Sequence, residues 1–412
     1  MQESKYYPWI VVGMLWVIAI LNYLDRQMLS TMQPFMQESI ESLRSAENFG
    51  RLMAVFLWIY AFMSPVSGII ADRLNRKWLI TASLFIWSGV TLAMGYTHTF
   101  GQLYVLRAIM GISEAFYVPA ALSLIADYHS SRTRSFAIGI HTTGIYLGQA
   151  FGGFGATIAA LSSWQATFHL FGIVGMAYSL VLIFFLHEKK GYVIDKTAPV
   201  SLKIEWKNAV KGLTVLLSNI SFWVILLYFS APSLPGWATK SWLPTLFVST
   251  LDMPMKDAGP FATMTLAFAS LMGVLVGGWM SDKWVRSYLK GRIYTGVIGL
   301  ALTVPGLLLL GFGATITPVF LGAFCFGFGF GMFDVNNMPI LCQFVSARYR
   351  ATGYGLLNLA GISAGAFITN FLGKSIDSGS LGRDMAMLIG AVVLVIALQL
   401  IILKPNTADM SE

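Results

Sequence analysis

Two short stretches place charged side chains inside apolar sequence, and their residue types could bind an anion and carry a proton. The first, N-Y-L-D-R at 22–26, sets Asp25 beside Arg26 in an apolar run from about residue 8 to residue 32. A charged side chain at the centre of a lipid bilayer costs roughly 2.5 to 3.5 kcal/mol on insertion scales. Two adjacent charges therefore indicate a polar site inside a helix bundle.

The second stretch, R-x-x-x-G-x-x-E-A at 107–115, spaces Arg107, Gly111 and Glu114 by four and three positions. This spacing puts the three residues on one face of a helix within about two turns. Gly111 would let a neighbouring helix or a ligand approach between the two charges. Apolar surroundings disfavour a carboxylate and a nearby arginine favours it, so we expect Glu114 to carry a proton.

These four charged residues divide into two expected roles. Asp25 joins Glu114 as a candidate for proton coupling. Arg26 and Arg107 are expected to hold a carboxylate, because guanidinium groups form paired hydrogen bonds with planar anions. An arriving anion would displace a carboxylate from its arginine and so couple uptake of the substrate to uptake of protons. The alternative is that these charges pair only to hold two helices together.

Neutral polar residues are further candidates for substrate contact. Asn22 lies on the polar stripe of the first apolar run, and Tyr60 lies near the middle of the second, where a packing role suits it equally. Gln149 and Asn358 sit in glycine-rich runs, where a buried amide needs partners. Hydrogen bonding between helices is the alternative for Asn358. Three more polar residues stay unassigned: Asp334, Asn336 and Asn337.

The composition indicates which elements position these residues. The chain has 412 residues, of which 56% are hydrophobic and 11% charged, and its mean hydropathy is +0.69. Soluble domains carry charge on about a quarter of their residues, so this is an all-α membrane protein. Twelve apolar runs are long enough to span a bilayer, near residues 8–32, 50–71, 78–97, 101–126, 136–160, 166–186, 221–248, 258–281, 293–313, 316–343, 352–373 and 385–403.

The loops between these runs give the orientation. Lys and Arg gather in alternate loops and in the central linker, which predicts that both termini and the linker are cytoplasmic. The net charge of +8 is explained by this topology, and no nucleic-acid partner is expected. Lys240 lies between Trp237 and Trp242, which we expect to anchor a membrane interface, so Lys240 should reach toward that interface, with substrate contact as the alternative. The two cysteines, Cys325 and Cys342, are too far apart on one predicted helix to form a disulfide.

An internal repeat divides the chain. The spacing of Gly68 and Asp72 recurs at Gly278 and Asp282, 210 positions later. A second set, Gly111, Glu114 and Pro119, recurs 220 positions later at Gly331, Asp334 and Pro339. The repeat predicts a first six-helix half at 1–186, a cytoplasmic linker at 187–220 and a second six-helix half at 221–412.

The loop after the second span carries a further motif, G-x-x-x-D-R-x-x-R-K at 68–77. An acid followed by bases at a helix end can hold helices together on the cytoplasmic side through charge-assisted hydrogen bonds. Positive-inside topology alone is the alternative explanation. The residues of this predicted cytoplasmic gate motif are Gly68, Asp72, Arg73, Arg76 and Lys77, with Asp282 as the counterpart in the second half.

With twelve spans in two halves, a basic central loop and the motif at 68–77, the chain resembles the major facilitator superfamily. That resemblance implies a substrate site at mid-membrane and rocker-switch alternating access. N-Y-L-D-R and R-x-x-x-G-x-x-E-A resemble the anion:cation symporter family, whose members carry sugar acids and other organic anions. The D-R pair at 25–26 and the G-x-x-E-A at 111–115 also resemble Spinster-like lipid transporters. The chain departs from those symporters directly after Glu114 and Ala115, where they often have a proline. Here that position is Phe116, and the next proline is Pro119.

The resulting expectation is a proton-coupled symporter that imports an organic monocarboxylate, favouring a sugar acid such as a hexonate, a uronate or a sialic acid. The alternative is a Spinster-like exporter of lipids or amphipathic drugs. The chain lacks the sequence motifs of phosphate loops, hydrolases and metalloproteases, so we expect no enzyme activity and no cofactor other than the coupling protons. The expected partners are a small organic anion, protons and the lipid bilayer. We expect the protein to be a monomer in a cell membrane, which in a bacterium is the inner membrane.

Overall fold

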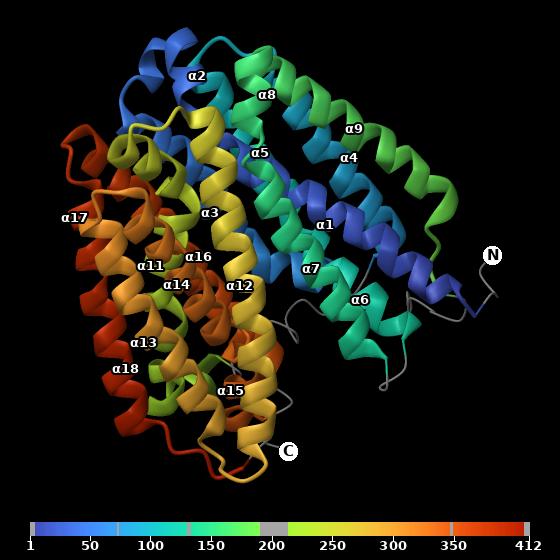
Figure 1. Ribbon diagram of the computed structural model, residues 1–412. Helices are drawn as coiled ribbons and strands as arrows, with labels where there is room; N and C mark the ends of the chain where they lie inside the picture. The colour runs from blue at the N-terminus through green and yellow to red at the C-terminus, as the bar shows by residue number, and fades with distance from the viewer. Residues whose placement is uncertain (1–4, 72–73, 130–132, 190–212, 347–348, 408–412) are drawn as a thin grey trace. The chain divides into compact units, whose positions relative to one another are not determined.

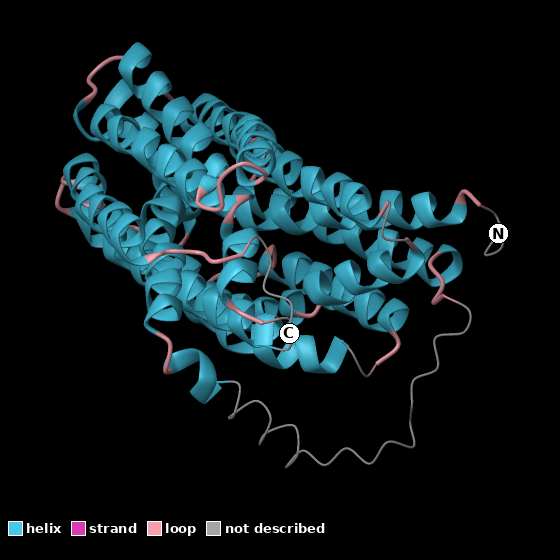
Figure 2. Cartoon of the chain, turned by 90° about the horizontal axis from the view of Figure 1, so that it is seen from below, coloured by secondary structure: helices cyan, strands magenta, loops and turns pink. Residues whose placement is uncertain are grey.

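The computed structural model describes residues 5–71, 74–129, 133–189, 213–346 and 349–407. Within these ranges every element is a helix and no strand forms (Figure 2). Twelve helical stretches are long and apolar enough to cross a membrane, which confirms the all-α membrane fold and the twelve predicted spans. The fourth, fifth, tenth and twelfth spans are each built from two consecutive helices.

The helices follow one another along the chain as Figure 1 labels them. They are α1 (Tyr7–Thr31), α2 (Gln33–Ser39), η1 (Glu41–Leu43), α3 (Ala46–Ala71), α4 (Arg76–Met94), α5 (Phe100–Ala115), α6 (Tyr117–Tyr128), α7 (Arg134–Gly152), α8 (Gly155–Leu161), α9 (Trp164–Phe185), α11 (Ile220–Leu251), α12 (Met255–Val285), α13 (Gly291–Phe312), α14 (Ile316–Asp334), α15 (Asn337–Phe344), α16 (Arg350–Asp377), α17 (Leu381–Met387) and α18 (Ile389–Ile402).

The chain forms two compact units. Unit 1 comprises Met1–Ile194, Lys240–Met264 and Thr369–Asp377, and unit 2 comprises Asp195–Thr239, Thr265–Ile368 and Ser378–Glu412. The helices α11, α12 and α16 therefore each contribute one part to unit 1 and another to unit 2. The two short segments of unit 1 lie in the predicted second half of the sequence, and the boundaries at 186 and 221 stay a prediction.

Close helix contacts build unit 1. The helices α1 and α7 lie side by side, as do α4 and α9 (Figure 1). Glycine makes the first contact possible, because a Cβ atom at Gly144 of α7 would lie 2.8 Å from the backbone oxygen of Trp16 on α1. At the second contact, a Cβ atom at Gly172 would lie 2.6 Å from the backbone nitrogen of Leu92. Small residues thus let the backbones of unit 1 approach closely.

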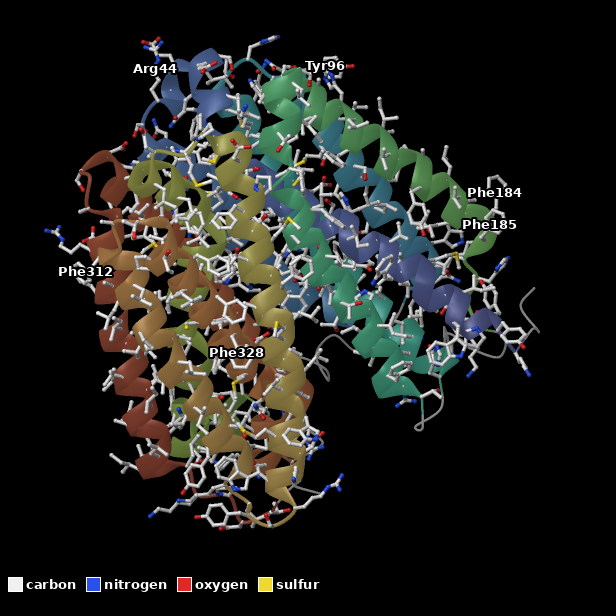
Figure 3. The ribbon with its side chains drawn as sticks, in the orientation of Figure 1. Arg44, Tyr96, Phe184, Phe185, Phe312 and Phe328 are labelled. Atoms are coloured by element: carbon white, nitrogen blue, oxygen red, sulfur yellow. The ribbon has the colours of Figure 1, made fainter. Side chains whose placement is uncertain are left out.

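Unit 2 has an apolar core of its own. Tyr228, Leu300, Phe333 and Val392, from four different helices, belong to one buried cluster. Apolar side chains also cover the outer surface of the helices: Phe184 of α9 is 72% exposed and Phe312 of α13 is 68% exposed, and both project outward (Figure 3). Such a surface suits lipid, so the protein is a multi-pass membrane protein.

Two spans are interrupted next to an acidic residue. The fourth span changes from α5 to α6 at Phe116, two positions after Glu114, and the tenth changes from α14 to α15 just after Asp334. The internal repeat aligns Glu114 with Asp334, so the interruption occurs at equivalent positions of the two halves. Interrupted membrane helices commonly mark binding sites, because the interruption frees backbone groups inside the bundle.

Candidate functional site

An ion pair between α1 and α5 is the centre of the candidate site. The Nε atom of Arg26 donates a hydrogen bond to Oε2 of Glu114 over 2.6 Å. The side chain of Arg26 is 11% exposed and that of Glu114 is fully buried. The structure therefore joins one residue expected to hold the substrate directly to the residue expected to carry the proton.

Aromatic rings surround the guanidinium group of Arg26. Its Cζ atom lies 4.5 Å from the ring centre of Tyr60, 4.8 Å from that of Tyr23 and 4.9 Å from that of Phe56. A cation over an aromatic face is attracted to the negative centre of the ring, and the attraction is strongest where water is excluded. Tyr60, predicted as a substrate contact, thus lies in the site beside Arg26.

Arg107 lies in the same buried cluster. Its Cζ atom is 4.6 Å from the ring centre of Phe56, and its Nη1 atom donates to the Sδ atom of Met110 over 3.1 Å. The close approach of α3 to α5 explains this arrangement. A Cβ atom at Gly111 would lie 2.8 Å from the backbone oxygen of Phe56, so glycine lets α3 lie against α5. The sequence left open whether a helix or a ligand uses that space, and the structure shows that α3 does.

Asp25 contacts α4, whereas its neighbour Arg26 contacts α5. Its Oδ2 atom accepts a hydrogen bond from Thr91 of α4 over 3.3 Å. The carboxyl group is buried and interacts electrostatically with Glu114 and Arg107. Both predicted proton-coupling acids and both predicted anion-binding arginines therefore belong to one buried cluster in unit 1.

Several polar atoms of this cluster have no hydrogen-bond partner among the described residues. They are both amide atoms of Asn22, Oδ1 of Asp25, Nη2 of Arg26, Nε of Arg107 and Oε1 of Glu114. Asn22 is fully buried and its amide lies near Glu114. Buried polar groups are nearly always satisfied, because an unpaired one costs about 1–3 kcal/mol. The cluster thus has both donors for an anion and acceptors for protons.

Two predicted substrate contacts are not joined to this cluster by any hydrogen bond in the described parts of the chain. Gln149 is buried on α7, the neighbour of α1. Asn358 is half-buried on the part of α16 that belongs to unit 2. Their roles stay predictions.

The predicted cytoplasmic gate motif forms a local network in unit 1. Arg76 is buried, forms an ion pair with Asp127 at the end of α6, and lies 4.0 Å from Oε1 of Glu188 beyond α9. The Nζ atom of Lys77 donates to the backbone oxygen of Ile183 over 2.7 Å. These contacts join α4 to α6 and α9, as expected of charge-assisted bonds. Of the remaining motif residues, Gly68 lies in the last turn of α3, whereas Asp72 and Arg73 lie outside the described residues.

The polar residues left unassigned in the second half form contacts with one another and with α12 in unit 2. Asn336 accepts a hydrogen bond from Ser281 of α12 over 2.5 Å. The amide of Asn337 donates to Asp334 over 3.0 Å. Asp282, the predicted counterpart of the gate motif, is exposed on α12. The hydrogen bond between Ser281 and Asn336 therefore joins α12 to the segment between α14 and α15.

The surroundings of Lys240 differ from the expected interface belt. Trp242 is fully buried, and its Nε1 atom donates to the backbone oxygen of Thr369 over 2.9 Å. The backbone oxygen of Lys240 accepts a hydrogen bond from Gln27 of α1 over 2.9 Å. The expectation that Trp242 anchors an interface is wrong, because this part of α11 packs inside unit 1.

Sequence reasoning missed Phe56 and Thr91, which contact the predicted charged residues directly. Phe56 is four positions before Tyr60, so helical spacing puts both on one face of α3. That spacing was the available signal. The sequence gives no indication of Thr91, because threonine is common in membrane helices. Its contact with Asp25 joins residues that are 66 positions apart.

Comparison with known proteins agrees with the fold. The sequence profile of the Major Facilitator Superfamily matches residues 15–370. A galacturonate transporter of Dickeya chrysanthemi is 25% identical over 324 residues, which cover 76% of this chain and 92% of that protein. A hexuronate transporter of Escherichia coli (strain K12) is 26% identical over 307 residues, which cover 69% of this chain and 68% of that protein.

Among solved structures, a bacterial homolog of the human lysosomal transporter Spinster, in an inward-facing and unoccupied conformation, has the same fold. Its TM-score is 0.73 at 22% sequence identity, and the alignment covers 97% of this chain and 96% of that one. The profile match extends over well more than half of the chain, and the described helices supply twelve membrane spans. The chain is therefore a membrane transporter, not an enzyme, and it belongs to the Major Facilitator Superfamily.

Proposed function

We propose that this transporter is a proton-coupled symporter that imports a sugar acid by rocker-switch alternating access. The observation that carries the proposal is the buried ion pair of Arg26 and Glu114, with Arg107 and Asp25 in the same cluster. The relatives named for galacturonate and hexuronate transport support a sugar acid, such as a uronate or a hexonate, as substrate.

The coupling follows from competition for one arginine. A substrate carboxylate that binds both Nη2 and Nε of Arg26 displaces Glu114 from Nε, and Glu114 then loses its counter-ion in an apolar site. An ionised carboxylate without a partner is costly there, so Glu114 takes up a proton as the anion enters. Asp25 is the second proposed acid, because its carboxyl group is buried next to Arg26 in the chain and its hydrogen bond comes from Thr91 and not from an arginine.

The neutral residues of unit 1 complete the proposed site. Asn22 and Tyr60 lie in the charged cluster, and Gln149 is a buried amide on a neighbouring helix. Hydroxyl groups of a sugar acid are matched by amides and a phenol, which can both donate and accept hydrogen bonds. A mostly apolar cargo would leave these polar atoms unsatisfied, which disfavours a lipid or amphipathic drug as substrate.

The remaining expectations complete the proposal. Both termini and the linker are cytoplasmic, the network of Arg76 and Lys77 belongs to the cytoplasmic gate, and the protein works as a monomer, in a bacterium in the inner membrane. No cofactor other than the coupling protons takes part.

The test is uptake by the purified protein in proteoliposomes, with and without an inward proton gradient. The panel contains D-galacturonate, D-glucuronate, D-galactonate, D-gluconate and N-acetylneuraminate, and a lysolipid is the arm for the alternative function. We expect at least one sugar acid to accumulate only when the gradient is present. Transport of the lysolipid without accumulation of any acidic sugar would replace the proposal with the Spinster-like function.

A further inference from the structure

We infer that Phe56 positions both arginines of the anion site, because its ring contacts Arg26 and Arg107 together. The inference rests on the proposed function, in which these arginines hold the substrate carboxylate. Phe56 is 1% exposed. Its ring centre lies 4.9 Å from Cζ of Arg26 and 4.6 Å from Cζ of Arg107. Phe56 is a positioning residue, because it acts through the arginines and has no group that binds an anion.

The backbone fixes where this ring lies. The backbone oxygen of Phe56 packs against Gly111, one turn after Arg107 on α5. Any larger residue at 111 would push α3 away, since a Cβ atom there would lie 2.8 Å from that oxygen. A backbone contact therefore fixes the segment of α3 that carries the ring against the segment of α5 that carries Arg107.

The charges of the cluster explain why a ring is needed there. Two guanidinium groups that share one ring repel each other, and Asp25 and Glu114 offset this repulsion only while they are ionised. In the proposed mechanism the acids are protonated as the anion enters, and this protonation removes that compensation. The attraction of an aromatic face for a cation does not depend on protonation of the acids. Phe56 therefore keeps both arginines in place when the acids are neutral.

Tyr23 and Tyr60 contact the same guanidinium group of Arg26 as Phe56 does. Their rings lie over Arg26, whereas the ring over Arg107 is that of Phe56. The loss of the Phe56 ring should thus affect the geometry of the two arginines relative to each other.

The main experiment compares Phe56→Leu with Phe56→Tyr and with Phe49→Leu in the purified protein. Phe49 is fully buried two turns earlier on α3 and contacts Trp242, so it controls for the loss of a buried ring. The dissociation constant for D-galacturonate is measured by calorimetry, and the KM and maximal rate by uptake. We expect Phe56→Leu to raise the dissociation constant and the KM about tenfold or more, with a smaller change in the maximal rate. Phe56→Tyr keeps the ring and should stay within about threefold of the parent.

A second measurement does not depend on the substrate. In protein labelled with ¹⁵N-arginine, the Nε–H signals of Arg26 and Arg107, assigned with Arg26→Lys and Arg107→Lys, should carry a ring-current shift. Both signals should move in Phe56→Leu and stay in Phe49→Leu. Failure of the parent to bind any sugar acid would defeat the proposed function, and the arginine spectrum would still decide on Phe56. The inference is overturned by arginine signals that do not respond to Phe56→Leu, or by Phe56→Tyr weakening binding as much as Phe56→Leu.

Discussion

Arg26 and Glu114 are direct partners, joined by a 2.6 Å hydrogen bond between α1 and α5. In the proposed mechanism the carboxylate of the substrate and that of Glu114 compete for this one guanidinium group, so anion binding favours protonation of Glu114. Breaking a buried ion pair by removing one partner costs roughly 3–5 kcal/mol, because the remaining charge is left uncompensated. In the proposed mechanism the arriving anion limits this cost, because it replaces Glu114 as the partner of Arg26.

The first prediction concerns Glu114→Gln. Glutamine cannot ionise, so it leaves Arg26 available to the anion and carries no proton. We expect gradient-driven accumulation of the sugar acid in proteoliposomes to be lost, while exchange of internal for external substrate persists. Glu41→Gln, at an exposed position outside the spans, serves as the control. Accumulation that is unchanged in Glu114→Gln would show that another residue couples the proton.

The second prediction concerns the number of protons. When Asp25 and Glu114 each bind a proton in a transport cycle, two protons cross the membrane with one monoanion. Each cycle then moves one net positive charge across the membrane. Transport then generates a current, and a membrane potential of 100 mV contributes about 2.3 kcal/mol to accumulation. Asp25→Asn should leave one proton per anion and abolish the current while uptake driven by a pH gradient continues. The check is electrophysiology of proteoliposomes on a solid support, and a current of the parental size in Asp25→Asn would exclude Asp25 from coupling.

The third prediction separates the charge of Arg107 from its shape. The substitution Arg107→Lys keeps the positive charge but removes the planar group that packs over Phe56 and binds a carboxylate with two hydrogen bonds. We expect the dissociation constant for the substrate to rise about tenfold to a hundredfold. Arg44→Lys is the matched control, because Arg44 is exposed just before α3 (Figure 3). Equal affinities in the two variants would remove Arg107 from the site.

The fourth prediction tests the network of Arg76. Its partners Asp127 and Glu188 lie on different segments of unit 1, and Arg76 is buried. Arg76→Ala should lower the free energy of unfolding by about 2 kcal/mol, a value between those of exposed and buried pairs. Thermal unfolding in detergent measures the change. Asp127→Asn should add little to Arg76→Ala, because both remove the same contact, and full additivity would argue against the pair.

The sequence predicted the twelve spans of the fold well, because the length of an apolar run follows directly from the thickness of the bilayer. It also predicted which charged residues gather, since Arg107 and Glu114 share a helix face and an isolated charge inside a membrane needs a partner. It did not predict which acid pairs with which arginine. Asp25 and Arg26 are adjacent in sequence, yet Asp25 bonds to Thr91 and Arg26 to Glu114.

Contacts between distant parts of the chain account for what was missed. The ring of Phe56 is one of many phenylalanines in the spans, and only the packing of α3 against Gly111 brings it to both arginines. Burial of Trp242 was missed for a similar reason. Tryptophan at a predicted helix end suggests a membrane interface, but its partner Thr369 lies 127 positions away.

The fifth prediction concerns another such contact, between the last residue of α16 and the first turn of α3. The carboxyl group of Asp377 accepts hydrogen bonds from Ser45 Oγ over 2.9 Å, from the backbone nitrogen of Ala46 over 2.8 Å and from that of Glu47 over 3.0 Å. Backbone N–H groups in the first turn of a helix have no partner within the helix, and a carboxylate there is favoured by the helix dipole. Asp377 is therefore an N-terminal cap that is supplied by a distant helix, because 331 positions separate it from Ala46.

Asp377→Ala should weaken this connection, whereas Asp384→Ala, which removes a carboxylate from the following helix, should not. The readout is the rate at which a maleimide labels Thr369→Cys in a protein whose Cys325 and Cys342 are replaced by serine. Thr369 is fully buried and bonded to Ser241 and Trp242, so labelling reports separation of α16 from its partners. We expect labelling to accelerate about tenfold, since loss of a cap costs about 1–2 kcal/mol. An unchanged rate in Asp377→Ala would mean that the contacts of Thr369 alone hold α16 in place.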